Sequence, residues 1–230
     1  MTEDIRDHEV NPSRTLVLVY DTETTGLPVW KEPSESPAQP HLVEICGLLY
    51  NEASRELVDS YHAIIRPDGW TIPDDVAEIH GITTERAMDE GVPEAEAIWR
   101  FLCLHERCRM RVAHNESFDA RIMRIALKRY GNGSAGGHLW TQDQRDAIAD
   151  AFKAALAFCT CNKAKPIMRL PATEAMRRSG RGRWFKPPTL QEAHQHFLGV
   201  PFDGAHGALA DAEACARVYF TLQSAQKAAA

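Results

Sequence analysis

Residues 15–27 read Thr-Leu-Val-Leu-Val-Tyr-Asp-Thr-Glu-Thr-Thr-Gly-Leu, an apolar run that ends in two carboxylates two positions apart. Side chains alternate between the two faces of a strand, so we expect Asp21 and Glu23 side by side on one face. The aliphatic run before them is typical of a strand that is buried on both faces in an α/β sheet. Two neighbouring carboxylates repel each other, which favours a cation between them. Taken alone, the same residues also fit a strand that simply ends in a polar turn.

The composition is that of a globular protein. Hydrophobic residues make up 44% and charged residues 25% of the 230 residues, which argues against wholesale disorder. No apolar run approaches membrane-spanning length, and the first residues lack the basic and apolar regions of a signal peptide. We therefore expect a cytoplasmic protein without a membrane partner. The six cysteines lack paired C-x-x-C spacing, so small buried thiols are expected rather than disulfides or a zinc site.

The charge is unevenly distributed along the chain. The net charge is −6, yet residues 163–186 contain eight basic residues and one acid, Glu174. The basic residues are Lys163, Lys165, Arg169, Arg177, Arg178, Arg181, Arg183 and Lys186. The overall charge therefore does not exclude a polyanionic substrate. With Trp184 and Phe185, this stretch fits two interpretations equally, a site for a nucleic-acid backbone and a solvated loop.

The order of apolar segments and turn signals predicts one domain over 1–230, an α/β fold with a mixed sheet. We expect a polar N-terminal arm at 1–14 and loops or insertions at 28–40 and about 131–188. Five strands are predicted, at Thr15–Asp21, His41–Tyr50, Leu57–Arg66, Met110–His114 and Ala154–Cys159. Proline, glycine and capping residues predict helices at Pro73–Ile79, at Thr84–Asp89, from Pro93, after Asn115, at Thr141–Phe152, at Thr189–Gly199 and at Ala208–Gln223.

A second acidic position follows the fourth predicted strand. In Ala113-His-Asn-Glu-Ser-Phe-Asp119, Asn115 as the N-cap would place Asp119 in the first turn of a helix. The free backbone N–H groups and the helix dipole favour an anion there. We interpret His114 as a structural residue. Glu44, within the second predicted strand, fits either a contact with a substrate sugar or a position facing solvent.

A third acidic position lies close to a histidine near the end of the chain. In Gly204-Ala-His-Gly-Ala-Leu-Ala-Asp211, the last residue lies five positions after His206. Five residues on one helix turn through about 500°, which leaves the two side chains roughly 140° apart. We therefore expect His206 on a loop that Gly204 and Gly207 permit, and Asp211 in the first turns of the helix that follows.

These positions predict a chemistry. Asp21, Glu23, Asp119 and Asp211 are four carboxylates without an obvious basic partner, and such oxygen ligands suit two hard divalent cations. Two cations about 4 Å apart can deprotonate a water on one side of a phosphodiester and stabilise the leaving oxygen on the other. A histidine on a loop, as at His206, is suited to take the proton from the attacking water. The pattern predicts phosphodiester hydrolysis.

Three segments resemble the motifs of the DEDD exonuclease superfamily, in the histidine-bearing branch that includes proofreading epsilon subunits and ribonuclease T. They are Asp21-Thr-Glu-Thr-Thr-Gly-Leu27, Ala113-His-Asn-x-x-Phe-Asp119 and His206-x-Ala-Leu-x-Asp211. His80-Gly-Ile-Thr83 is similar to the segment that lies between the first two motifs in this family. The resemblance implies a ribonuclease H-like fold, here with a central five-stranded mixed β-sheet flanked by helices.

The resemblance also implies an activity, the exonucleolytic release of mononucleotides from a 3′ end with Mg²⁺ or Mn²⁺. Asp21 would bridge two cations, and Glu23 and Asp211 would complete the site of one of them. Asp119 would hold the other cation, partly through water. His206 would be the general base.

A substrate pocket is implied in the same way. Its residues would be Thr24, Thr25, Gly26, Leu27, His80 and Phe118. The first four would lie against the terminal nucleotide, with Leu27 wedged beside its base. His80 and Phe118 would help to wall the pocket, although His80 fits equally well as a cap of its own short helix.

Among the possible substrates we favour single-stranded or frayed DNA ends, with trimming of RNA 3′ ends as the runner-up. The two differ in whether the pocket accepts a 2′-hydroxyl, which the sequence does not determine. In a different class, the chain could be a nucleic-acid-binding module on a decayed nuclease fold, but all five catalytic positions are occupied. Only 19 residues follow Asp211, so we expect no stably bound polymerase partner. The sequence does not indicate an oligomeric state.

Overall fold

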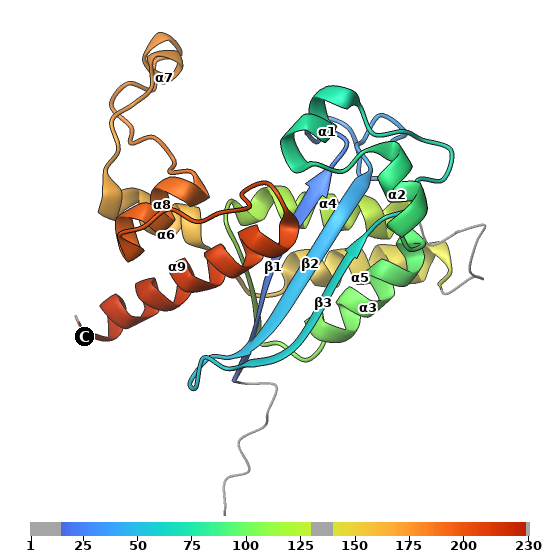
Figure 1. Cartoon of the computed structure of the whole chain (residues 1–230), viewed down its shortest axis with the longest axis horizontal. Helices are drawn as coiled ribbons and strands as arrows, with labels where there is room; N and C mark the ends of the chain where they lie inside the picture. Colours follow the sequence, from blue (N-terminus) through green and yellow to red (C-terminus); the bar gives the residue numbers. More distant parts are fainter. Residues whose placement is uncertain (1–14, 130–139, 229–230) are drawn as a thin grey trace, which may run out of the picture.

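The computed structural model describes residues 15–129 and 140–228, and its centre is a five-stranded mixed sheet in the order β3-β2-β1-β4-β5 (Figure 1). The strands are β1 (Leu16–Thr24), β2 (Leu42–Asn51), β3 (Leu57–Ile64), β4 (Met110–Ala113) and β5 (Ala157–Cys159). β1–β2 and β2–β3 are antiparallel pairs, whereas β1–β4 and β4–β5 are parallel pairs. The predicted five-stranded mixed sheet is confirmed. The N-terminal arm predicted at 1–14 lies outside the described residues.

β1 is longer than the sequence predicted. It continues past the expected end at Asp21 to Thr24, because β2 remains paired with it as far as Leu42. Asp21 and Glu23 therefore lie within the strand rather than in a polar turn after it. Alternation along the strand places these two carboxylates on one face of the sheet and Thr22 on the other.

Nine helices lie within the described residues. They are α1 (Asp74–His80), α2 (Thr84–Glu90), α3 (Glu94–His105), α4 (Glu116–Arg129), α5 (Gln142–Ala154), α6 (Thr160–Met168), α7 (Glu174–Arg178), α8 (Leu190–Leu198) and α9 (Ala208–Ala228). The capping boxes predicted at Thr141 and Thr189 are both present. Gly81 ends α1 with a φ of 74°, the left-handed conformation that glycine adopts without strain.

Asn115 lies directly before α4, at the predicted N-cap position, but its backbone conformation is unusual for a cap. Asn115 has a φ of 69°, in the left-handed region, whereas an N-cap residue normally has an extended backbone. Its carbonyl oxygen accepts a hydrogen bond from the backbone N–H of Phe118 at 2.8 Å. Asp119 nevertheless lies in the first turn of α4, as predicted.

The two faces of β1 pack against different layers of helices. On one face, Leu18 and Tyr20 pack in a buried cluster with side chains from α3, α4 and α5. On the other face, Val17 and Val19 pack against α9. Burying each large apolar side chain stabilises the fold by roughly 1.5–3 kcal/mol. The strand that carries Asp21 and Glu23 is therefore held from both sides.

The insertion predicted at 131–188 is largely ordered structure. Its residues 131–139 lie outside the described part of the chain. α5 and β5 belong to the core, since Phe152 and Phe158 are buried in the two clusters. α6 is a helix that the sequence did not indicate, because Pro166 inside it reads as a helix breaker. Beyond α6 the chain leaves the body of the molecule and carries α7 at its far end (Figure 1).

The cysteines and the length of the apolar helices were also predicted from the sequence. All six cysteines are free thiols, and Cys46, Cys161 and Cys215 are buried as predicted, whereas the other three are only partly buried. Among the described residues, no helix is both long and apolar enough to cross a membrane.

Candidate active site

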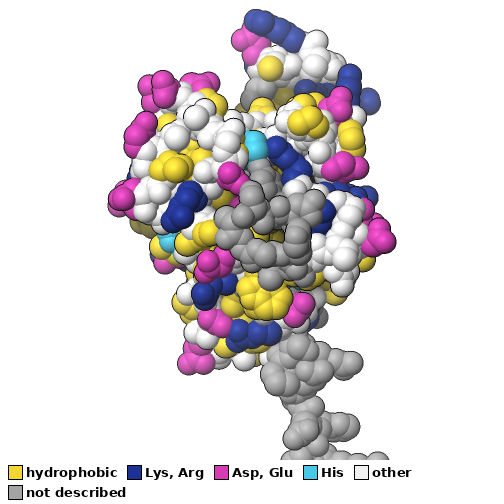
Figure 2. Space-filling model, turned by 90° about the vertical axis from the view of Figure 1, so that its right-hand side faces the viewer, with side chains coloured by type: hydrophobic (Ala, Val, Ile, Leu, Met, Phe, Trp, Pro, Cys, Tyr) yellow, Lys and Arg dark blue, Asp and Glu magenta, His cyan; other side chains and the backbone are white. Residues whose placement is uncertain are grey.

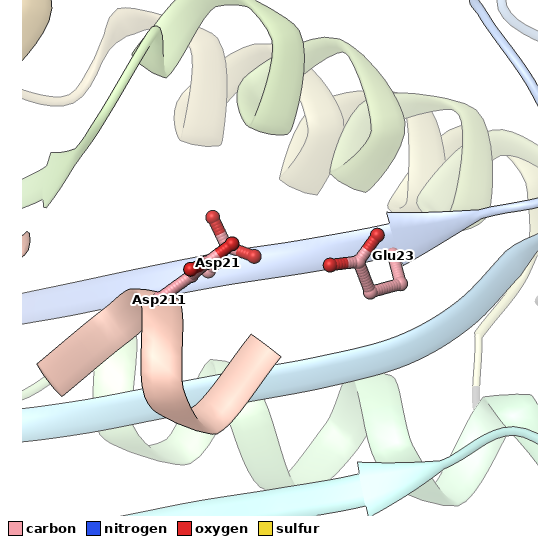
Figure 3. A group of neighbouring side chains, drawn as sticks. All are labelled: Asp21, Glu23 and Asp211. Carbon is pink, nitrogen blue, oxygen red and sulfur yellow. The ribbon is translucent and has the colours of Figure 1, made fainter. Parts of the chain in front are cut away.

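Three carboxylates from two elements meet beside the sheet (Figure 3). Asp21 and Glu23 project from β1, and Asp211 projects from the first turn of α9. One oxygen atom of each lies within 4.8 Å of one oxygen of each of the others. The structure therefore brings together three of the four carboxylates that the sequence predicted as metal ligands.

The loop before α9 has the form that the sequence predicted. α9 begins at Ala208, and the preceding His206 has a left-handed φ of 69°. The backbone N–H of His206 donates a hydrogen bond to Asp211 Oδ2 at 3.3 Å. The side chain of His206 is exposed to solvent. The histidine is thus connected to the carboxylate cluster through its backbone, and its imidazole is accessible.

Asp119 lies apart from the three-carboxylate cluster. It is only 2% exposed, and its Oδ1 accepts hydrogen bonds from the backbone N–H of Thr22 at 3.1 Å and from Thr22 Oγ1 at 2.8 Å. Thr22 and α4 lie on the face of β1 opposite to Asp21. Asp119 nonetheless raises the pKa of Asp21 by Coulombic repulsion, so the two carboxylates share one electrostatic environment.

Glu44 is a member of the site that the sequence did not identify. It is directly opposite Glu23 in the β1–β2 pair and is 6% exposed. Its Oε1 lies 2.7 Å from His62 Nε2, and its Oε2 accepts a hydrogen bond from the backbone N–H of Ala208 at 2.8 Å. The expected solvent-facing position is wrong, because Glu44 is buried. Glu44 instead joins β2 and β3 to the first residue of α9.

The carboxylates of the site are difficult to ionise together. Burial, followed by repulsion from Asp119, Asp211 and other acids, raises the pKa of Asp21 well above its usual value. Burial and the neighbouring acids raise the pKa of Glu23 to about 8. Burial also raises the pKa of Asp119 to about 8, although the hydrogen bonds from Thr22 oppose this shift. Burial raises the pKa of Asp211 as well.

Glu44 behaves differently from its neighbours. Although burial acts to raise its pKa, the hydrogen bonds from His62 and Ala208 lower it below the usual value. Glu44 is thus an ionised, fully bonded carboxylate, whereas Asp21, Glu23 and Asp211 repel one another when they ionise together. A cation bound among these three would relieve that repulsion.

The donor set fits a hard divalent cation. Asp211 Oδ1 is a buried oxygen that has no hydrogen-bond partner among the described residues. Such an atom is costly to bury unless a ligand binds it. Carboxylate oxygens from Asp21, Glu23 and Asp211 are the ligands that Mg²⁺ and Mn²⁺ prefer.

Four of the residues predicted to bind the terminal nucleotide, Thr24 to Leu27, lie at the end of β1 and in the turn that follows it. Thr24 is buried, and its Oγ1 donates to the carbonyl oxygen of Gly26 at 2.7 Å. Thr25 joins the turn to the start of β2, since its Oγ1 accepts from the backbone N–H of His41 at 2.9 Å. The side chain of Leu27 is 82% exposed. The two threonines shape the turn, and Leu27 is the residue that is available for contact.

His80 and Phe118, the other two residues predicted to line the substrate pocket, both make contacts within the fold. His80 Nδ1 accepts a hydrogen bond from the backbone N–H of Ile82 at 3.2 Å, so the histidine does bond to the end of its own helix. Its buried Nε2 makes no well-formed hydrogen bond among the described residues, although the Thr24 backbone interacts with the ring and raises its pKa against the larger effect of burial. Phe118 is partly buried against the core cluster of α3, α4 and α5.

The loop at 28–40 is ordered rather than loose. Gln39 is buried, and its Nε2 donates to the backbone carbonyls of Val29, Glu32 and Pro33 at 2.9 to 3.1 Å. Arg121 of α4 donates to Ser34 Oγ at 2.9 Å and connects the loop to the body. The loop therefore has a defined position beside the turn that follows β1.

Comparisons with known proteins agree with this geometry. A profile of the RNase T exonuclease family matches residues 18–219. Two DNA polymerase III proteins of PolC type, from Thermotoga petrophila and Thermotoga maritima, are each 33% identical to the chain over 117 residues. That stretch is 49% of this chain but only 7% of each polymerase.

Solved structures of exonuclease I share the fold. Escherichia coli exonuclease I in complex with a dT13 oligonucleotide has a TM-score of 0.65 and 16% identity, over 93% of this chain and 42% of that one. Exonuclease I from Methylocaldum szegediense has a TM-score of 0.62 and 20% identity, over 92% of this chain and 41% of that one. The chain thus spans about two fifths of these proteins, and the expected ribonuclease H-like fold is confirmed. Since the family profile covers most of its length, the chain belongs to the exonuclease family of the DEDD superfamily.

Proposed function

We propose that this chain is a metal-dependent 3′→5′ exonuclease that acts on single-stranded or frayed DNA ends. The observation that carries the proposal is the cluster of Asp21, Glu23 and Asp211, whose oxygens lie within 4.8 Å of one another in a member of the exonuclease family. In the reaction, water attacks the terminal phosphorus and the bond from that phosphorus to the neighbouring 3′ oxygen breaks. The products are a nucleoside 5′-monophosphate and a strand one nucleotide shorter with a new 3′-hydroxyl.

Two divalent cations, Mg²⁺ or Mn²⁺, would activate the water and stabilise the leaving oxygen. Asp21, Glu23 and Asp211 would hold one of them directly. Asp119 would serve the second, once its carboxylate turns from Thr22 toward Asp21. The unpartnered Asp211 Oδ1 and the raised pKa values of the cluster support this assignment.

His206 is the general base of the proposed reaction. Its imidazole is exposed on a loop, and its backbone N–H is bonded to Asp211, so it is attached to the site without being buried in it. A neutral imidazole would take the proton from the attacking water. The left-handed backbone of His206 and the glycines around it allow the loop to adjust to a bound strand.

The terminal nucleotide would lie against the turn of Thr24, Thr25, Gly26 and Leu27. The exposed Leu27 side chain would pack beside the last base, and His80 would help to wall the pocket beside Thr24. Phe118 would close the apolar side of the pocket. DNA is favoured over RNA because relatives of the chain include PolC-type DNA polymerases and exonuclease I bound to a deoxythymidine oligonucleotide.

The test uses 5′-labelled single-stranded DNA, a duplex with a mispaired 3′ end, and RNA of the same sequence, each incubated with protein and Mg²⁺. We expect progressive shortening from the 3′ end, fastest on single-stranded DNA, with nucleoside 5′-monophosphates as the products on chromatography. A strand blocked by a 3′-phosphate is the matched control and should be shortened far more slowly.

Two results would contradict the proposal and favour another function. Faster shortening of RNA than of DNA would favour a 3′-end-trimming exoribonuclease. Binding of the strands without hydrolysis of any of them would favour a nucleic-acid-binding module on a decayed nuclease fold.

A further inference from the structure

The basic projection, defined here as residues 163–186, begins within α6 on the body of the molecule, leaves the body after that helix and has α7 at its tip (Figure 1). Backbone hydrogen bonds join its outgoing and returning parts. Lys186 N donates to Leu170 O at 3.0 Å, and Arg181 N donates to Met176 O at 2.8 Å. The projection is therefore a defined part of the fold.

Both ends of the projection are anchored close to the carboxylate cluster. His114 connects them, since its Nδ1 lies 2.9 Å from Thr160 Oγ1 and its Nε2 lies 3.0 Å from the carbonyl oxygen of Pro188. Thr160 Oγ1 also lies 3.7 Å from Cys215 Sγ, one helical turn after Asp211 on α9. The two flanks of the projection thus join the body just after β4 and β5, beside the part of α9 that carries Asp211.

The positive charge of the projection is mostly uncompensated. It holds eight basic residues and one acid in a chain with a net charge of −6. Arg178 pairs with Glu174, and Lys186 pairs with Glu192. The other basic residues have no carboxylate within ion-pair distance in the described part of the chain: Lys163, Lys165, Arg169, Arg177, Arg181 and Arg183. Figure 2 shows Lys and Arg side chains gathered on the segment that stands above the body.

Two aromatic rings lie exposed among these charges. Trp184 is 54% exposed and Phe185 is 41% exposed, and Lys165 Nζ lies 5.9 Å from the centre of the Trp184 ring. Exposed rings beside cations are the combination that proteins use to bind single strands, because bases stack on the rings while the cations neutralise phosphates. An acidic protein surface would use the charges but not the rings.

We infer that the basic projection binds the single-stranded part of the substrate on the 5′ side of its terminal nucleotide. This inference rests on the proposed function and adds a second contact region outside the carboxylate cluster. Phosphates lie against Lys165, Arg181 and Arg183, and bases stack on Trp184 and Phe185. A strand long enough to reach the projection therefore binds more tightly than a nucleotide that occupies the cluster alone.

The test measures binding of a 5′-fluorescein-labelled oligothymidylate of about 20 nucleotides to the full chain by anisotropy, over a range of salt concentrations. Chelator is present, so that cations in the carboxylate cluster do not contribute. One variant combines Lys165→Gln, Arg181→Gln and Arg183→Gln. Its matched control removes the same charge from exposed arginines elsewhere, Arg66→Gln, Arg100→Gln and Arg217→Gln.

The projection variant is expected to bind at least about ten-fold more weakly, and its slope of log affinity against log salt should fall by about two, at roughly 0.7 for each lost phosphate contact. Trp184→Ala should weaken binding about five-fold or more without changing the slope. Trp99→Ala, which removes a similarly exposed ring (48%) on α3, is its control and should bind as the native chain does.

Two results would overturn the inference. In the first, the projection variant binds as tightly as its control. In the second, polyglutamate competes as well as unlabelled oligothymidylate does and Trp184→Ala has no effect, which would assign the projection to an acidic protein partner.

A second substrate separates this inference from the proposed function. The p-nitrophenyl ester of thymidine 5′-monophosphate is too short to reach the projection, so all the variants should hydrolyse it at the native rate with Mn²⁺. Suppose that binding depends on the projection but the native chain hydrolyses neither the ester nor DNA. That result would support strand binding by the projection and contradict the proposed nuclease activity. Hydrolysis of both substrates, together with binding that is independent of the projection, would support the nuclease activity and contradict the inference about the projection.

Discussion

Glu44 on β2 accepts a hydrogen bond from the backbone N–H of Ala208, the first residue of α9, at 2.8 Å. The first N–H groups of a helix have no partner within the helix, so a carboxylate at this position accepts a hydrogen bond from one of them. Its negative charge also interacts favourably with the helix dipole. α9 carries Asp211 in its first turn, and His206 lies just before it. Glu44 therefore fixes the start of α9 relative to β1. In this way it also fixes the positions of Asp211 and His206.

Replacing Glu44 tests this role. Glu44→Ala should lower the free energy of unfolding by about 1–3 kcal/mol, because a buried N–H loses its acceptor. It should also lower kcat, since Asp211 and His206 are no longer held, whereas Glu44→Gln retains an acceptor and should recover part of the loss. Denaturant titration and turnover of an oligonucleotide measure the two effects.

The control for this variant is Gln144→Ala. Gln144 Oε1 accepts from the backbone N–H of Thr141 at 2.8 Å in the capping box of α5, so the change removes a comparable helix-end bond away from the site. It should reduce stability and leave kcat unchanged. A Glu44→Ala protein that behaves like Gln144→Ala in both measurements would show that Glu44 has no positioning role.

His206→Ala tests the general base. Loss of a positioned base typically slows turnover by about a hundred-fold or more. Binding of Mn²⁺, measured by calorimetry, should remain close to native because no carboxylate of the cluster is changed. His196→Ala, an exposed histidine on α8, is the control and should turn over normally. Native kcat in His206→Ala would remove the residue from the mechanism.

The raised pKa values predict how stability depends on pH without metal. Glu23 and Asp119, each with a pKa of about 8 in the folded state, have usual values near 4. Between these values the folded state binds more protons than the unfolded state, so stability is present at low pH and is lost as pH rises toward about 8. Divalent cation should reverse this loss.

Glu23→Gln isolates this effect. In chelator at about pH 8 the variant should melt at a higher temperature than the native chain. The difference should be far smaller at about pH 5, because that pH lies only just above the usual pKa of Glu23. Mn²⁺ should raise the Tm of the native chain more than that of the variant. Glu213→Gln, an exposed residue on α9, should show neither difference. Equal melting of Glu23→Gln and native chain at both pH values would contradict the crowding of charge in the cluster.

Asp119→Asn separates the structural and catalytic roles of this residue. The Asn carbonyl oxygen can accept both hydrogen bonds from Thr22, so stability in chelator should be native or higher. Activity should fall by at least about ten-fold, because a neutral amide is a poorer cation ligand than a carboxylate. Asp203→Asn, an exposed residue in the loop before α9, is the control. An active Asp119→Asn enzyme would exclude Asp119 as a ligand.

Much of the site was predictable because its residues follow local rules. Alternation along β1 placed Asp21 and Glu23 on one face, and the helical rotation between His206 and Asp211 placed the histidine on a loop before α9. Both expectations rest on a few consecutive residues, and the structure agrees with them.

What could not be predicted depends on contacts distant in the sequence. Glu44 opposes Glu23 only through the register of the β1–β2 pair, which no local pattern specifies. Thr22 binds Asp119 across 97 positions of the chain. The helix that contains Pro166 goes against the preference of proline, because the packing of α6 outweighs it.

The measurement that tests the central claim most directly follows a 5′-labelled single strand on a sequencing gel with Mg²⁺, with chelator, and with Mg²⁺ restored after chelation, for the native chain and for Asp21→Asn. If Asp21, Glu23 and Asp211 hold the catalytic cation, a ladder that shortens from the 3′ end will form only with the native chain and Mg²⁺, and it will return when Mg²⁺ is restored. Equal shortening in chelator, or a native rate in Asp21→Asn, would contradict the account.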